Sequence, residues 1–282
     1  MSARVTVVIP HYNDAAYLPG AVASIEESEP VAVIVVDDCS SDPAVQPVLD
    51  ALRSTGVRVE TLPENGGAGV AMNHGAALAD TRYVFFLGAD DLVVPGSLGR
   101  LADALDADPG LDFAYGDYEF FGALNHVMES YAWEPWRAYY ASCWCGVFMV
   151  RRDAHRAVGG FAGRTTIEDW DFFMTCAEQG RRGRRVPGLS FRYRIAESGR
   201  RSQAARGRMR EERRLLRAAH PALAARRREM QARVSPIVRI AFPLAHELRV
   251  RLPPRAGDRL FDVLACVRRS YPRRGGRRRV SR

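Results

Sequence analysis

The chain has 282 residues, enough for one large domain, or one domain with an extension, around a substantial core. Its N-terminus runs directly into an apolar segment without a signal-peptide pattern, and no apolar run approaches the roughly 18 residues that a membrane helix needs. The five cysteines show no CxxC spacing, and their odd count argues against a disulfide framework. We therefore expect a cytoplasmic protein in a reducing compartment.

The net charge of +8 is distributed unevenly along the chain. Residues 181–282 contain 31 Arg and 7 acidic residues, a net charge of +24, whereas residues 1–180 carry −16. An acidic body with a basic C-terminal part suggests an anionic partner, such as a phospholipid surface, a nucleic acid or another protein.

Strands, polar loops and helices alternate through the first ninety residues. The expected elements are strands at 4–9, 31–36, 57–62 and 83–87, and helices at about 17–27, 43–53 and 70–79. This alternation predicts an α/β fold with a Rossmann-like, doubly wound and mostly parallel sheet, connected by right-handed crossovers. In such a sheet the polar loops lie together at the carboxyl ends of the strands, where ligands bind.

Two adjacent carboxylates, Asp90 and Asp91, follow directly after the fourth strand. A fully buried strand has no favourable place for charge, so the pair is expected to point into the crevice at the sheet edge. Hard oxygen ligands at this position suit Mg²⁺ or Mn²⁺ held together with a substrate diphosphate. The alternative is a solvated turn after the strand.

The pattern becomes less regular after Asp91, although a helix at 97–105 and a short strand at 113–115 are expected. A dense aromatic stretch follows at 117–147, and it forms either a sugar platform or part of the core. A later helix is expected from about residue 168 to residue 179. Its first turn is acidic, which the helix dipole favours, so a purely structural role for these acids is open.

Six short motifs occur in one order along the chain. They are Pro10-His11-Tyr12-Asn13, Asp37-Asp38-Cys39-Ser40-Ser41-Asp42, Asn65-Gly66-Gly67 with Asn73-His74-Gly75, Ala89-Asp90-Asp91, Gly159-Gly160-Phe161 and Glu168-Asp169-Trp170-Asp171. The combination resembles the family 2 glycosyltransferases of the GT-A fold, over roughly residues 3–200. Residues 1–200 would then form the catalytic domain, and residues 201–282 an Arg-rich helical extension whose last 12 or so residues are disordered.

The resemblance implies a nucleotide-sugar site in the loops that follow the strands. The ring of Tyr12 would lie beside the base, and Asp37 or Asp38 would accept a hydrogen bond from a uracil or thymine N–H, which favours UDP or dTDP and leaves GDP open. The expected donor contacts are Pro10, Tyr12, Asn13, Asp37, Asp38, Asn65, Gly67, Asn73, Asp90 and Arg194.

The resemblance also implies an inverting transfer to a hydroxyl group. Asp90 and Asp91 would hold Mn²⁺ or Mg²⁺, which acts as a Lewis acid on the departing nucleoside diphosphate. Asp169 would be the general base for the acceptor hydroxyl, and desolvation against Trp170 would raise its pKa. Glu168 would orient the acceptor or cap the helix. The acceptor would be a glycan, a lipid-linked molecule or a natural product.

Three positions depart from the family pattern. Gly88 stands where many relatives have an Asp, Met72 where an Arg is frequent, and Ala196 where a His is usual. These departures keep open a catalytically silent nucleotide-sugar-binding scaffold. A sugar nucleotidyltransferase is a further alternative, but loop 10–16 lacks the glycine-rich, basic phosphate loop of such enzymes.

The Arg-rich segment 202–233 predicts a basic amphipathic helix, or a pair of helices broken near Pro221. With short apolar segments at 237–244 and 260–267, it fits peripheral attachment to the inner face of the cytoplasmic membrane, where lipids are anionic. The alternatives are a solvated helix packed on the catalytic domain and a disordered tail at 271–282. Nucleic acid is the least favoured partner because no recognised motif accompanies the charge.

Overall fold

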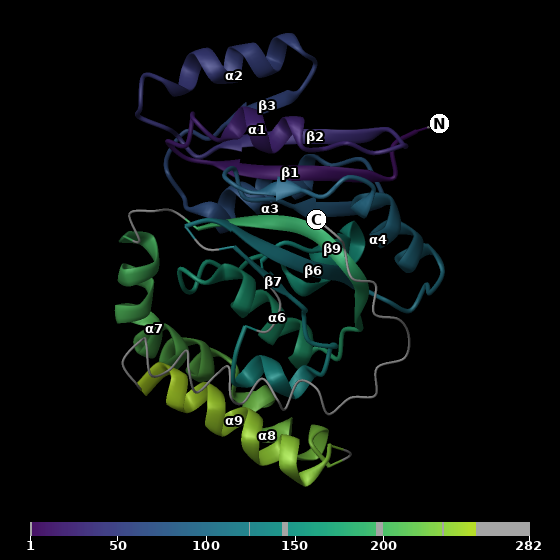
Figure 1. Cartoon of the computed structure of the whole chain (residues 1–282), viewed down its shortest axis with the longest axis vertical. Coiled ribbons are helices and arrows are strands. Elements are labelled where there is room, and N and C mark those ends of the chain that lie inside the picture. The colour runs from purple at the N-terminus through teal and green to yellow at the C-terminus, as the bar shows by residue number, and fades with distance from the viewer. Residues whose placement is uncertain (1, 124, 143–145, 196–199, 233, 252–282) are drawn as a thin grey trace. The chain divides into compact units, whose positions relative to one another are not determined.

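The computed structural model describes residues 2–123, 125–142, 146–195, 200–232 and 234–251 (Figure 1). The expected apolar segment at 260–267 and the expected disordered end at 271–282 lie outside these ranges. The chain divides between residues 226 and 227 into two compact units. None of the described helices is long and apolar enough to cross a membrane.

The first half of the sheet consists of parallel strands, as the sequence predicted. Strand β1 pairs with β2 on one side and with β4 on the other, and β2 pairs with β3. The side chains along β1 and β4 are buried almost throughout, because helices cover both faces of a doubly wound sheet. The elements are β1 (Val5–His11), α1 (Leu18–Ala23), β2 (Val31–Asp37), α2 (Val45–Ser54), β3 (Arg58–Thr61), α3 (Ala68–Leu78) and β4 (Tyr83–Phe86).

The second half makes the sheet mixed. Among the described residues nine strands form one sheet in the order β3-β2-β1-β4-β8-β6-β9-β5, with β7 beside β6. Strand β8 is antiparallel to both β4 and β6, and β9 is parallel to β6, so β6 and β9 run in the direction of β1–β4. The predicted mostly parallel α/β sheet is therefore confirmed. The added strands are β5 (Leu92–Val93), β6 (Phe113–Gly122), β7 (His126–Met128), β8 (Met149–Arg151) and β9 (Gly183–Ile195).

The sequence did not predict strand β9, which is held by an ion pair between a buried aspartate and a half-buried arginine. Asp117 of β6 accepts two hydrogen bonds of 2.7 Å from the Arg185 guanidinium, one on each carboxylate oxygen, and a third from the Gly188 backbone N–H. The β6–β9 register shifts at this point. Beyond the bulge β9 continues to Ile195, so it carries Arg194 along β6 toward the edge where β4 ends.

The helix that carries the expected catalytic acids is part of the core. Helix α6 (Glu168–Glu178) buries an almost continuous set of side chains, including Phe172 and Phe173, and both rings pack against Phe148. Trp136, in the 3-10 helix η1 (Pro135–Tyr139), is also buried. The aromatic stretch thus contributes to the core at Trp136, whereas Trp144 lies outside the described residues. The first compact unit also contains α4 (Ser97–Asp106) and α5 (Arg152–Val158).

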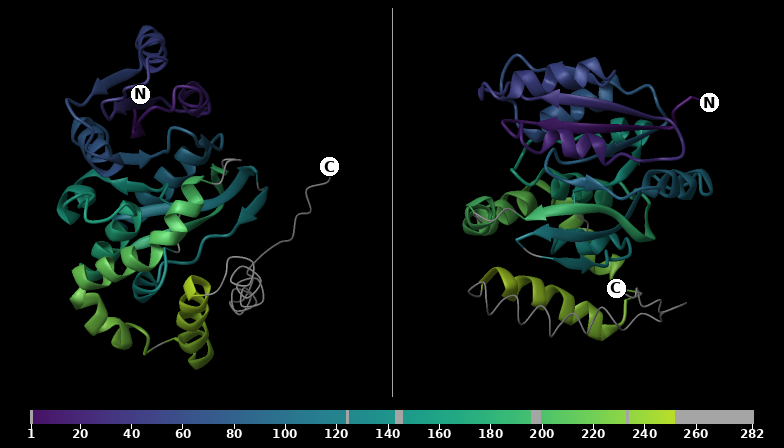
Figure 2. Two further views of the ribbon diagram at one scale, coloured as in Figure 1. Left: turned by 90° about the vertical axis from the view of Figure 1, so that its left-hand side faces the viewer. Right: turned by 45° about the horizontal axis from the view of Figure 1, so that its top comes forward.

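The Arg-rich segment is helical. Helices α7 (Arg200–Ala219) and α8 (Pro221–Met230) meet at Pro221, where the sequence predicted a break, and α9 (Pro236–Arg251) follows. All of α7 belongs to the first compact unit, which ends at Arg226. Figure 2 shows the course of these helices from two further sides.

Candidate active site

Asp37 joins the loop after β1 to the loop after β2. Its carboxylate accepts hydrogen bonds from His11 Nδ1 at 2.9 Å and from the hydroxyl and backbone N–H of Ser40. The other ring nitrogen of His11 accepts the Asp14 backbone N–H, so the ring proton belongs on Nδ1. Asp37 and His11 are both buried. The sequence did not identify His11 as part of this arrangement, although a histidine at a strand end opposite an aspartate was the available signal.

Asp38 organises the loop that leads into α3. Its two carboxylate oxygens accept the backbone N–H groups of Gly66 and Gly67, each at 2.8 Å, and the Asn65 side chain donates to the Asp38 carbonyl. Gly67 has φ +87°, a conformation that favours glycine, and it directly precedes the first turn of α3. Three residues that are predicted to bind the sugar nucleotide are therefore brought together here: Asp38, Asn65 and Gly67.

The three residues around the first loop that are predicted to bind the nucleotide differ in how much of each side chain is already used in contacts within the protein. The Asn13 side-chain oxygen accepts the backbone N–H groups of Ser41 and Asp42, so its amide fastens one loop to the other. Tyr12 has 43% of its surface exposed, which leaves its ring accessible to a ligand. Pro10 is half-buried within β1.

The acidic pair meets Arg194 at the carboxyl end of β4. Asp91 is only 3% exposed, and burial, reinforced by the charge of Asp90, raises its pKa to about 8. The Arg194 backbone N–H donates to Asp91 at 2.9 Å, and its Nε donates to the Asp90 carbonyl at 2.8 Å. The guanidinium lies over the rings of Phe121 and Tyr17, at 4.3 and 4.6 Å. No pattern in the sequence pointed to these two rings as partners of Arg194.

The two carboxylates fit a divalent cation, although they do not complete its coordination. A Cβ atom added to Gly88 would lie 2.8 Å from Asp91 Oδ2 and 3.3 Å from Asp90 Oδ1, so both oxygens border one small space. Within the described part of the chain, no group of three or more His, Cys, Asp or Glu side chains could hold a metal ion. A hard cation would then take its other ligands from substrate phosphates and water, as Mg²⁺ commonly does.

Asp169 lies in the first turn of α6 and is half-buried. Burial raises its pKa to about 6, with a further rise from the neighbouring Glu168 charge. The Ser142 hydroxyl donates to Asp169 Oδ2 at 3.4 Å. The adjacent Trp170 is anchored through its indole N–H on the Ala138 carbonyl, which fixes the start of the helix. A carboxylate with this pKa is suited to accept a proton near neutral pH.

Glu168 connects the start of α6 to the start of α3. Its side chain packs against Gly69, whose backbone also provides a hydrogen bond to the carboxylate. Burial raises the pKa of Glu168, and the charges on Glu212 and Asp171 add to that rise. Glu168 therefore stands beside the start of α3, next to the loop that Asp38 organises.

Asn73 has a structural contact in this arrangement. Its amide donates to the Phe161 carbonyl at 2.8 Å and accepts the Phe161 backbone N–H at 2.9 Å. These two bonds tie α3 to the Gly-Gly-Phe turn after α5. A direct contact between Asn73 and the sugar nucleotide remains a prediction.

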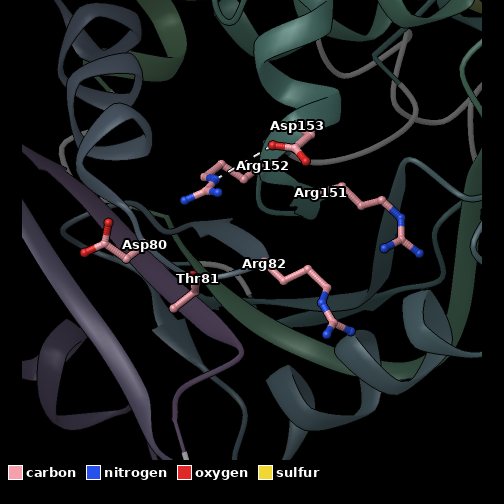
Figure 3. Close-up of a pocket in the computed structure, with 6 residues that line it drawn as sticks. All are labelled: Asp80, Thr81, Arg82, Arg151, Arg152 and Asp153. Atoms are coloured by element: carbon pink, nitrogen blue, oxygen red, sulfur yellow. Dashed lines mark ion pairs between the residues drawn. The ribbon is translucent and has the colours of Figure 1, made fainter.

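A shallow cavity of about 300 Å³ lies at the other end of β4 (Figure 3). Its arginines already have partners: Arg82 binds Asp106, and Arg152 binds the Ala79 carbonyl. In Figure 3 the side chains of Arg82 and Arg151 point away from that of Arg152. The cavity is remote from the acidic pair, because it borders the start of β4 rather than its end.

Comparison with known proteins identifies the family. The model of glycosyl transferase family 2 matches residues 6–159. The chain belongs to this family. The match covers the donor loops and the acidic pair, and it ends at Gly159, before Glu168 and Asp169.

Relatives of this family 2 chain include proteins named for polysaccharide synthesis. It is 25% identical over 185 residues to an uncharacterized glycosyltransferase of Haemophilus influenzae, a match that covers 62% of each chain. It is 38% identical over 105 residues to the succinoglycan biosynthesis protein ExoO of Rhizobium meliloti, covering 36% of this chain and 30% of ExoO. The matches thus span less than two thirds of either relative.

Solved structures show the GT-A fold. TarS of S. aureus (residues 1–349, in complex with UDP-GlcNAc) matches with a TM-score of 0.64 and 20% identity, covering 91% of this chain and 83% of that fragment. The mannosyltransferase PcManGT of Pyrobaculum calidifontis, in complex with GDP-Man and Mn²⁺, matches with a TM-score of 0.59 and 18% identity, covering 95% and 81%. The predicted GT-A fold of family 2 is confirmed.

Proposed function

We propose that this family 2 chain is an inverting glycosyltransferase that moves a sugar from a nucleoside diphosphate sugar to an acceptor hydroxyl. The observation that carries the proposal is the meeting of three features at one sheet edge. These are the loops joined by Asp37 and Asp38, the acidic pair beside Arg194, and Asp169 with its pKa near 6.

UDP or dTDP is the favoured donor nucleotide. The exposed ring of Tyr12 offers a surface for a base, and the neighbouring carboxylates offer acceptors for a pyrimidine N–H. The TarS complex contains UDP-GlcNAc, which agrees with this choice, whereas the PcManGT complex contains GDP-Man. GDP is therefore included among the nucleotides to be tested.

Asp90 and Asp91 would hold Mn²⁺ or Mg²⁺, with the remaining ligands supplied by the diphosphate and by water. The cation would supply Lewis-acid stabilisation of the charge on the departing nucleoside diphosphate. Arg194 stands beside the pair, where its fixed guanidinium can bind a diphosphate oxygen.

Asp169 would remove the proton from the acceptor hydroxyl as that oxygen attacks the anomeric carbon. Its raised pKa makes it a better base than an ordinary aspartate, because a base works best when its pKa lies near the working pH. Glu168, anchored on the start of α3, would orient the acceptor rather than take the proton.

The acceptor is proposed to be a glycan or lipid-linked molecule of a bacterial polysaccharide. The names of two relatives support this class: ExoO in succinoglycan biosynthesis, and TuaG of Bacillus subtilis, a putative teichuronic acid biosynthesis glycosyltransferase that is 38% identical over 91 residues (31% of this chain and 36% of TuaG).

Attachment to an anionic membrane surface accompanies this proposal. On α9, Ile237, Ile240 and Leu244 recur at helical spacing and are exposed, Ile237 by 73%. Residues 227–282 contain 16 Arg and 4 acidic residues. This charge opposes association with a second copy and attracts anionic lipid, into which the apolar stripe could insert.

Calorimetric titration with UDP, dTDP, GDP and CDP, each with Mn²⁺ and with EDTA, tests the donor site. Saturable, metal-dependent binding of one nucleotide is expected, and Asp90→Ala should weaken it in the presence of the metal. Unchanged binding by that variant would contradict the metal assignment. If no nucleotide binds, the departures at Gly88, Met72 and Ala196 would favour a catalytically silent scaffold.

A further inference from the structure

His220, at the junction of α7 and α8, is buried between two carboxylates of α6. Its Nε2 lies 2.7 Å from Asp171 Oδ1, and its Nδ1 lies 2.9 Å from Glu178 Oε2. His220 and Asp171 are each 1% exposed. One histidine therefore contacts both the first and the last turn of the helix that carries Asp169.

The geometry requires a doubly protonated ring. Ionised carboxylates only accept hydrogen bonds, so both ring nitrogens of His220 must donate, and only the imidazolium has two N–H groups. The pKa of His220 is raised in agreement with this, since the bonds to Asp171 and Glu178 outweigh the opposing effect of burial.

The same two helices hold α6 at further points. Glu212 of α7 accepts hydrogen bonds from the Thr166 hydroxyl and backbone N–H, just before α6 begins. The Leu223 backbone N–H of α8 donates to Glu178 at 2.9 Å, at the end of α6. Arg217 of α7 lies over the Tyr139 ring in η1, which itself packs against α6. These contacts hold both ends of α6.

We propose that His220 is a positioning residue for catalysis: as an imidazolium it fixes α6, and thereby Asp169, against α7 and α8. The proposal rests on the proposed role of Asp169 as the base. It makes α7, which the sequence assigned to an extension, a working part of the catalytic unit.

The charges around the ring define how it responds to pH. The groups that face it are Asp171 and Glu178; Arg164 also binds Asp171 at 3.0 Å, and Arg226 reaches the Glu178 carbonyl. Loss of the ring proton at alkaline pH removes one of the two donors, which releases one end of α6. Turnover should therefore fall at alkaline pH for a reason separate from Asp169.

The first test is His220→Gln, compared with Arg214→Gln as a control. Arg214 lies on α7 and forms an exposed ion pair with Glu211, so its loss leaves α6 untouched. Transfer is measured as nucleoside diphosphate release from UDP-GlcNAc, dTDP-glucose or GDP-mannose, whichever binds. We expect His220→Gln to lower kcat by about tenfold or more, with the nucleotide Kd changed less than about twofold. An unchanged kcat in the folded variant would overturn the proposal.

The second test uses Glu178→Gln and remains decisive if His220→Gln does not fold. Removing one carboxylate lowers the pKa of the imidazolium, so the alkaline limb of kcat should shift by about one pH unit to lower pH. The pKa of His220, followed by ¹⁵N NMR in the unliganded protein, should shift in parallel. A neutral ring in the wild type at pH 7, or an unmoved limb, would overturn the proposal. Asp169→Asn separates the two ideas: if that variant still transfers sugar, the base assignment fails, whatever His220 does.

Discussion

At the residue scale, the pKa of Asp169 sets the acid limit of turnover. A general base works only when ionised, and burial raises the pKa of Asp169 to about 6. We expect kcat at saturating donor and acceptor to fall about tenfold per unit as the pH drops well below 6, while nucleotide binding persists. The measurement is a pH profile of kcat between pH 5 and 8. A profile that is flat down to pH 5 would show that Asp169 is not the base.

His155 should make the fold sensitive to acid. It is buried among Phe86, Phe161 and Phe172, and burial lowers its pKa from 6.5 to about 4. As the pH falls, His155 takes up a proton in the unfolded chain before it does so in the folded chain. The contribution of the neutral, buried His155 to stability is therefore fully present above pH 6.5 and is lost as the pH falls toward 4. The loss amounts to about 3 kcal/mol in the free energy of unfolding.

The prediction is tested by denaturant unfolding at pH 7 and pH 4. His155→Phe should lose much less stability than the wild type between these values, because it has no group to protonate. His126→Gln is the matched control, since His126 is exposed on β7. Equal losses in the wild type and His155→Phe would contradict the assignment.

At the element scale, β9 depends on the buried Asp117. The carboxylate accepts the paired bonds of Arg185 and the backbone N–H groups of Gly188 and Ser130. Asp117→Ala leaves a charged group and two backbone donors without an acceptor, which should lower the free energy of unfolding by about 3–5 kcal/mol. Chemical denaturation measures this loss. The control is Asp153→Ala, which removes an exposed ion pair with Arg152 and should lower the free energy of unfolding by less than about 0.5 kcal/mol. A similar loss of stability in both variants would contradict this role of Asp117.

The contrast between β1 and β9 explains what the sequence could predict. Strand β1 begins with an uninterrupted β-branched run, Val5–Ile9, and Asp90 follows closely after the apolar strand β4. Both the strand and the place of Asp90 could therefore be predicted from local patterns. Strand β9 contains four arginines, a proline and two glycines, and it forms because Asp117 pairs with Arg185 across the sheet. No local pattern reveals such a pair.

The candidate site divides in the same way. The sequence placed Asp38, Asp90 and Asp169 at element ends, where local motifs identify them. It did not predict that Asn73 would bind the Phe161 backbone, or that His220 would bind α6, because those contacts join segments 88 and 49 residues apart. Residues defined by such long-range contacts require the folded chain.

At the scale of the whole molecule, the basic C-terminal part should bind anionic lipid. We expect the full chain to sediment with vesicles of phosphatidylglycerol, and to remain in solution with pure phosphatidylcholine, because the attraction is electrostatic. Replacing Ile237, Ile240 and Leu244 with serine should reduce sedimentation several-fold. If these replacements leave sedimentation unchanged, the membrane attachment lies elsewhere in the chain. If the full chain is instead a dimer that these replacements abolish, the exposed apolar side chains of α9 bind a second copy.

A chain that ends at Ala232 should separate lipid binding from donor binding. It keeps α8 whole together with the first compact unit, which ends at Arg226. We expect nucleotide binding within about twofold of the full chain, and no sedimentation with anionic vesicles. Loss of nucleotide binding would mean that residues beyond 232 contribute to the donor site.

We propose that this family 2 chain transfers sugar with Asp169 as the base. The most direct measurement compares nucleoside diphosphate release by the wild type and by Asp169→Asn, alongside calorimetric binding of the same sugar nucleotide. Removal of a general base should lower turnover by roughly 10²- to 10⁴-fold, while the donor Kd changes less than about twofold. Turnover in Asp169→Asn close to that of the wild type would contradict the claim.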